Sequence, residues 1–129
     1  YTKKIQIEAR VLGDLAMNHI VPIASKYEAQ LLDKVYKMSQ IGGLDASSDI
    51  RLIKKIQNHT AEIQRLTGEM IDARKVANKI EEPRAKAIAY HDTVAVCFDE
   101  IRRHIDKLEE IVDDQIWPLP KYRELLFLR

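Results

Sequence analysis

A row of apolar residues, spaced alternately by four and three positions, runs through the middle of this chain from Leu52 to Ile80. The alternation has no gap, and its only polar member is His59. Such spacing places every member on one face of an α-helix, and a sustained heptad pattern is typical of helices that contact one another along their length. We therefore predict one long helix over residues 49–80. Its seam consists of Leu52, Ile56, His59, Ile63, Leu66, Met70, Ala73, Ala77 and Ile80.

The preceding part of the chain repeats this spacing and predicts a helix over residues 2–39. Pro22 lacks the backbone N–H that a helix needs, so we expect a kink near residues 18–20. A second apolar row on the first turns predicts burial from two sides and makes them a candidate for a surface covered by another domain. That second row consists of Ile7, Val11 and Leu15.

A third helix is predicted over residues 83–114. Pro83 suits the first position of a helix, and the residue before a proline disfavours helical geometry, so the second helix must end before it. Glycines at 42 and 43 are suited to end the first helix. The candidate N-caps of the second helix are Asp45, Ser47 and Ser48.

Three long helices joined by short loops predict an all-α fold. We expect an elongated antiparallel three-helix bundle with shallow crossing angles, forming a single helical domain over residues 1–129. Only four glycines and four prolines interrupt the chain, which favours long regular elements. Residues 116–129 are expected to form a short C-terminal helix or tail.

The charge balance argues against two classes of partner. The 21 basic and 20 acidic residues nearly cancel, which leaves no general attraction to nucleic acid. The longest stretch without a charged residue, 15–25, contains Asn18, His19 and Pro22, so it is too short and too polar to cross a membrane. The single cysteine, Cys97, excludes an internal disulfide and fits a reducing compartment. We expect a cytoplasmic protein that binds neither nucleic acid nor membrane.

We predict no catalytic, cofactor-binding or metal-binding residues in this sequence. Dinuclear metal sites in helical bundles use glutamates three residues before a histidine, and no histidine here has an acidic residue at that position. We predict structural roles for all four histidines, with His59 partly buried and hydrogen-bonded, although proton transfer or ligation remains the alternative. Cys97 is expected to be a buried, inert thiol. The glycines that phosphate-binding loops require are absent.

Two stretches resemble a known family. Residues 7–22 and residues 112–127 are similar to the C-terminal region of the type III glutamine synthetases, the long-chain bacterial branch of that enzyme family. The second stretch contains the motif Trp117-Pro118-Leu119-Pro120-Lys121-Tyr122-Arg123. The resemblance extends over the whole chain and is specific at both ends.

This resemblance implies a parent enzyme that joins glutamate and ammonia with the use of ATP and magnesium. It also implies that the ligands of these groups precede Tyr1, so this segment holds no cofactor. Because the chain starts with Tyr1 rather than methionine, we expect a C-terminal fragment of a larger enzyme, with a scaffold or oligomer-assembly role. Its partners would be the catalytic domain of the same chain and neighbouring subunits. The alternative is a stand-alone helical adaptor or protein-interaction module.

Aromatic and apolar residues gather near the end of the sequence. Tryptophan and tyrosine are favoured anchors at protein interfaces, which makes this cluster a candidate contact with another domain or subunit. The alternative is that Trp117 folds back and caps the core of the bundle. The cluster consists of Trp117, Leu119, Tyr122, Leu125, Leu126 and Phe127.

Overall fold

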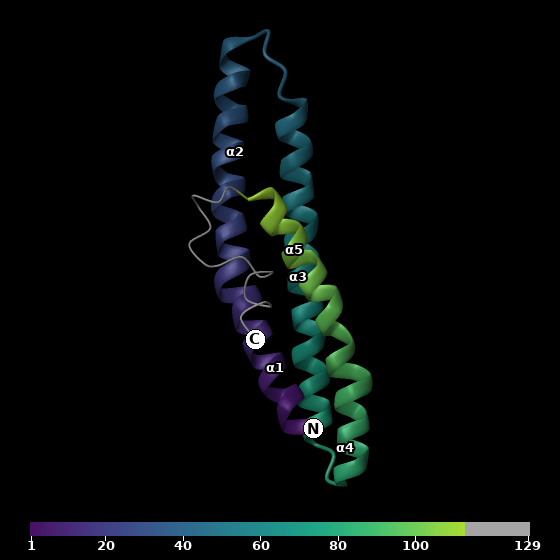
Figure 1. Ribbon diagram of the computed structural model, residues 1–129. Coiled ribbons are helices and arrows are strands. Elements are labelled where there is room, and N and C mark those ends of the chain that lie inside the picture. The colour runs from purple at the N-terminus through teal and green to yellow at the C-terminus, as the bar shows by residue number, and fades with distance from the viewer. Residues whose placement is uncertain (113–129) are drawn as a thin grey trace.

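The structure is a computed structural model that describes residues 1–112, and these residues are helical throughout apart from their short loops (Figure 1). The predicted all-α class is therefore confirmed. None of the helices within residues 1–112 combines the length and the apolar character needed to cross a membrane. The predicted tail cluster, Trp117 to Phe127, lies outside the described residues.

The first helical segment has three parts. Helix α1 (Thr2–Leu15) continues through a π-helical turn, η1 (Ala16–Ile20), into α2 (Val21–Ile41). Within η1 the N–H of Val21 donates to the carbonyl oxygen of Ala16, five residues earlier. Pro22 follows directly and has no N–H to continue the α-helical pattern. The interruption expected near residues 18–20 thus takes the form of a widened turn, one of the known places where helices kink.

The loop between α2 and α3 (Ser47–Asn78) begins with two glycines whose φ angles are positive, 77° at Gly42 and 74° at Gly43. Residues other than glycine rarely adopt this conformation, so the two glycines are suited to end α2. The carboxylate of Asp45 accepts a hydrogen bond from the backbone N–H of Ser47 at 2.9 Å and another from the Ser47 hydroxyl. These bonds lower the pKa of Asp45. Asp45 therefore accepts hydrogen bonds from the first residue of α3, although it lies one residue before the N-cap position, which Ala46 occupies.

The third segment begins where the sequence predicts it, at Pro83. The side chain of Glu82 accepts hydrogen bonds from the backbone N–H groups of Arg84 and Ala85 and so caps the helix. Helix α4 (Pro83–Ala89) then passes through a π-helical turn, η2 (Tyr90–Val94), and a 3-10 turn, η3 (Ala95–Cys97), into α5 (Phe98–Ile111).

The irregular turns in the middle of this segment were not predicted, because no proline or glycine marks them. The hydroxyl of Thr93 donates to the carbonyl oxygen of Ala89 at 2.6 Å, which competes with the helix's own bonds. Tyr90 is fully buried, and its hydroxyl donates to the side-chain oxygen of Asn78 on α3. A side-chain hydrogen bond within the segment and a hydrogen bond to another helix therefore occur at the same turn.

Helix α3 is the central element, because it contacts every other helical segment within residues 1–112. Figure 1 shows the chain running up through α1 and α2, down through α3, and up again through α4 and α5. The core lies along α3 and includes members of the seam predicted for that helix, such as Ile56, Ile63 and Met70. Its residues with at most 1% exposure include Ala16, Ile20, Ala24, Ile56, Ile63, Met70, Ala77, Tyr90, Val94, Ile101, Ile105 and Leu108.

Replacement of Gly68 by alanine is expected to stabilise the protein by about 1 kcal/mol, because glycine is the weakest helix former after proline. Gly68 lies within α3, and a Cβ added there meets no atom within 4 Å. Gly42→Ala should instead destabilise, since its φ of 77° strains any residue with a Cβ. Urea denaturation followed by circular dichroism measures both changes. A loss of stability in Gly68→Ala would contradict the regular helix at this position.

Candidate functional site

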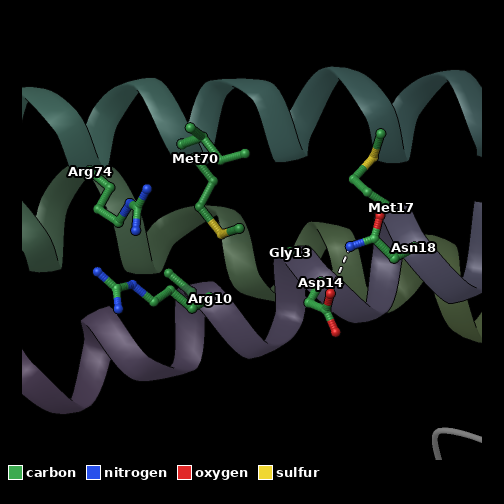
Figure 2. A pocket seen from close by; sticks show the side chains of 9 residues that line it. Arg10, Gly13, Asp14, Met17, Asn18, Met70 and Arg74 are labelled. Atoms are coloured by element: carbon green, nitrogen blue, oxygen red, sulfur yellow. Dashed lines mark hydrogen bonds between the residues drawn. The ribbon is translucent and has the colours of Figure 1, made fainter.

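A groove of about 270 Å³ lies between the first helical segment and α3 (Figure 2). Its floor is largely apolar, and charged side chains stand at its edges. Gly13 contributes no side chain there; an added Cβ would lie 3.5 Å from the terminal methyl of Met70. The groove is lined by Ala9, Arg10, Gly13, Asp14, Met17, Asn18, Met70, Ile71 and Arg74.

Two arginines stand at one end of this groove. Figure 2 shows Arg10 extending from α1 and Arg74 from α3, with both guanidinium groups at the same end of the groove. Neither forms an ion pair with a carboxylate of residues 1–112. In contrast, Arg65 lies between two carboxylates, at 2.6 Å from Glu62 and 2.8 Å from Glu69. The groove thus collects two cationic groups, neither of which forms an ion pair with a carboxylate of the described residues.

Asp14, the acidic side chain of the groove, interacts with residues other than the two arginines. Asn18 donates a hydrogen bond of 2.7 Å to one carboxylate oxygen of Asp14, and the Nε2 atom of His19 lies 3.7 Å from the other. All three residues belong to α1 or to the π-helical turn η1. The carboxylate is therefore held by polar partners on its own helical segment rather than by the two arginines.

A second surface lies on the outer side of α1. Ile7 is 55% exposed and Val11 62% exposed, while Leu15 is half-buried. The predicted burial of this row from two sides is therefore wrong within residues 1–112, because no described helix covers that side of α1. Lys3 and Lys4 flank the two apolar side chains.

Two histidines meet between α3 and α5. The Nδ1 atoms of His59 and His104 lie 2.9 Å apart, and the ring centroids are separated by 5.2 Å. One ring must donate the hydrogen bond and the other must accept it, so at least one of the two rings carries no proton on Nδ1. His104 is buried, with 5% of its surface exposed, and His59 is partly buried. The hydrogen-bonded structural role predicted for His59 agrees with this geometry.

Burial is the main cause that lowers the pKa of both histidines. For His59 the next cause is the positive charge of His104 when that ring is protonated. Neighbouring charges also act: cations lower and carboxylates raise the pKa of each ring. The groups facing the pair are Lys55, Glu62 and Arg65 on α3, and Glu100, Arg103 and Lys107 on α5.

The remaining candidates for chemistry lie apart from one another. His19 and His91 are exposed beside Asp14 and Asp92. Cys97 is a buried thiol whose pKa is raised, mainly by burial. No cluster of three or more histidine, cysteine, aspartate or glutamate side chains within residues 1–112 is arranged to hold a metal ion.

Comparison with known proteins connects this helical chain to one family. A family model described as glutamine synthetase C-terminal domain matches residues 1–39. The chain is 51% identical, over its entire length, to a glutamine synthetase of Bacteroides fragilis (strain YCH46). It is 26% identical over its entire length to the type-3 glutamine synthetase of Dictyostelium discoideum. A glutamine synthetase of Butyrivibrio fibrisolvens is 25% identical over 98% of the chain.

In each of these relatives the chain spans only 18% of the protein's length. The Dictyostelium relative also extends the similarity beyond bacteria. The matched model lies at the first helical segment, which contains one of the two stretches that carry the resemblance found in the sequence. That resemblance is confirmed: the chain is similar to the glutamine synthetase C-terminal domain at residues 1–39 and to proteins named glutamine synthetase along its whole length.

Proposed function

We propose that this chain is the non-catalytic C-terminal helical domain of a type III glutamine synthetase. The parent would be a cytoplasmic homo-oligomer that ligates glutamate and ammonia with ATP and magnesium. The observation that carries the proposal is the extent of the alignments with these relatives. Relatives named glutamine synthetase align with the whole of this chain, yet the chain is only 18% of each. The catalytic residues would then lie in the larger part of the parent.

Within that parent, the domain would act as a scaffold in assembly. An elongated antiparallel bundle offers long rigid faces, and an exposed apolar strip on one of them suits burial by another part of the enzyme. Ile7 and Val11 form such a strip on α1, opposite the face that packs on the core. The partner would be the catalytic domain or a neighbouring subunit. The tail cluster around Trp117 and Tyr122 would contribute a second contact.

Removal of this segment from the parent enzyme is expected to reduce its oligomer size, measured by light scattering. The isolated chain should form no glutamine from glutamate, ammonia, ATP and magnesium. A sharper variant is Ile7→Gln/Val11→Gln in the parent, which removes the apolar strip without deleting a helix. The matched control is Ile88→Gln/Val96→Gln, which changes two equally exposed apolar residues on the third segment.

Two results would contradict the proposal. Turnover by the isolated chain would exclude a non-catalytic domain, and an unchanged oligomer after deletion would exclude the scaffold role. The alternative, a stand-alone helical adaptor, requires an open reading frame without a catalytic region, which sequencing of the parent gene decides directly.

A further inference from the structure

The groove between α1 and α3 gathers positive charge in an unusual way. Arg10 and Arg74 come from different helices and direct their guanidinium groups into one end of it. Like charges brought together repel, and residues 1–112 supply no carboxylate that pairs with either arginine. An anion between the two groups would remove this repulsion.

Arginine also defines the kind of anion. Its planar fork of N–H donors matches two oxygen atoms of a carboxylate or phosphate, and each such bond is strengthened by charge. Two forks from opposite walls can therefore hold one oxyanion from two sides. A single exposed arginine, such as Arg84 at the start of α4, offers no such clamp.

The rest of the groove suits a small apolar group. Met17, Met70 and Ile71 line it, and Gly13 leaves its floor open. Methionine side chains adapt easily to the shape of a ligand. The volume of about 270 Å³ lies below that of pockets for drug-sized molecules, roughly 300–1,000 Å³. A ligand of few atoms is therefore indicated.

Asp14 fixes the direction in which such a ligand lies. Its carboxylate is held by Asn18 and His19 and repels an anion from that part of the groove. The anionic end must lie at Arg10 and Arg74. We propose that this groove is a binding site for a small oxyanion, a phosphate or a carboxylate, that carries a short apolar group. The proposal does not rest on the assembly role proposed above.

The test is a titration of the 129-residue chain, followed by the NMR shifts of backbone amides. The probes are inorganic phosphate, benzoate, phenyl phosphate and, as a cationic counterpart with the same ring, benzylamine. We expect phenyl phosphate and benzoate to produce saturable shifts centred on Gly13, Asn18 and Ile71. Inorganic phosphate should bind more weakly, because it lacks the apolar group, and benzylamine should not bind at this place.

Arg10→Gln and Arg74→Gln should each weaken phenyl phosphate binding by about tenfold, as expected for loss of a charged hydrogen-bonding group. Arg84→Gln removes the same charge outside the groove and should leave the affinity unchanged. Asp14→Asn should strengthen binding, since it removes the competing negative charge. Arg10→Lys keeps the charge without the fork, so an intermediate affinity is expected if Arg10→Gln fails to fold.

Three outcomes would overturn the proposal. The first is the absence of saturable shifts at the groove with any anionic probe. The second is an equal loss of affinity in Arg84→Gln, which would indicate general attraction between charges. The third is binding of benzylamine at the same amides, which would assign the groove to apolar contact alone.

Discussion

Replacement of Ile63 by alanine is expected to lower the free energy of unfolding by about 2–5 kcal/mol. Ile63 lies in α3, is fully buried, and belongs to the core cluster that joins all the helical segments. Truncation removes apolar surface from the core and leaves a cavity that packed helices fill only partly. Urea denaturation followed by circular dichroism measures the change.

Ile88→Ala is the matched control for this variant. Ile88 is 52% exposed on α4, so its truncation should change the free energy of unfolding by no more than about 0.5 kcal/mol. Equal effects of the two substitutions would show that the seam of α3 is not packed against its neighbours. A broadened transition in Ile63→Ala would indicate that the helical segments no longer unfold as one unit.

The core face of each helix could be predicted from the sequence because burial depends on spacing within one helix. The seam predicted for the second helix supplies the fully buried residues Ile56, Ile63 and Ala77. Pro22 also marked the place of the π-helical turn η1, since the missing N–H is a property of the residue itself. The turn at residues 90–94 could not be predicted in this way. It depends on the contact between Tyr90 and Asn78, which joins two helices.

The groove and the histidine pair depend on how neighbouring helices are aligned. Periodicity places Arg10 and Arg74 on their own helices but does not state that they reach the same groove. The same holds for His59 and His104, which are 45 positions apart in the sequence. The exposed strip at Ile7 and Val11 is the converse case. An apolar row there predicted a covering element that residues 1–112 do not provide.

Acidification is expected to destabilise the protein through the His59–His104 pair. Histidine in an unfolded chain has a pKa of about 6.5, and burial lowers the pKa of both rings in the folded state. At pH values just below about 6.5 the unfolded chain therefore binds more protons than the folded chain. The pair's contribution to stability is fully present above that pH, decreases as the pH falls through 6.5, and levels off below the lowered pKa values.

The geometry of the pair limits its protonation further. One proton can be shared in an N–H···N bond, but two imidazolium rings would present two donors across 2.9 Å. Two unit charges at that separation repel by roughly 6 kcal/mol at an effective dielectric constant of about 20. Protonation of both rings therefore requires them to move apart, which disturbs the contact between α3 and α5. Arg103 and Lys107 oppose protonation of His59 as well.

The variant His59→Leu/His104→Leu should remove most of the pH dependence between about pH 7.5 and 5.5, measured as the free energy of unfolding in urea at each pH. Replacement of both partners by apolar residues of similar size costs little at neutral pH, whereas His104→Leu alone leaves His59 without its partner and should cost about 1–3 kcal/mol. His19→Gln/His91→Gln is the control, because both histidines are exposed. If the control flattens the curve and the double leucine variant does not, the pair is not the acid-sensitive contact. The opposite result would locate it between α3 and α5, where His104 is almost completely shielded from solvent.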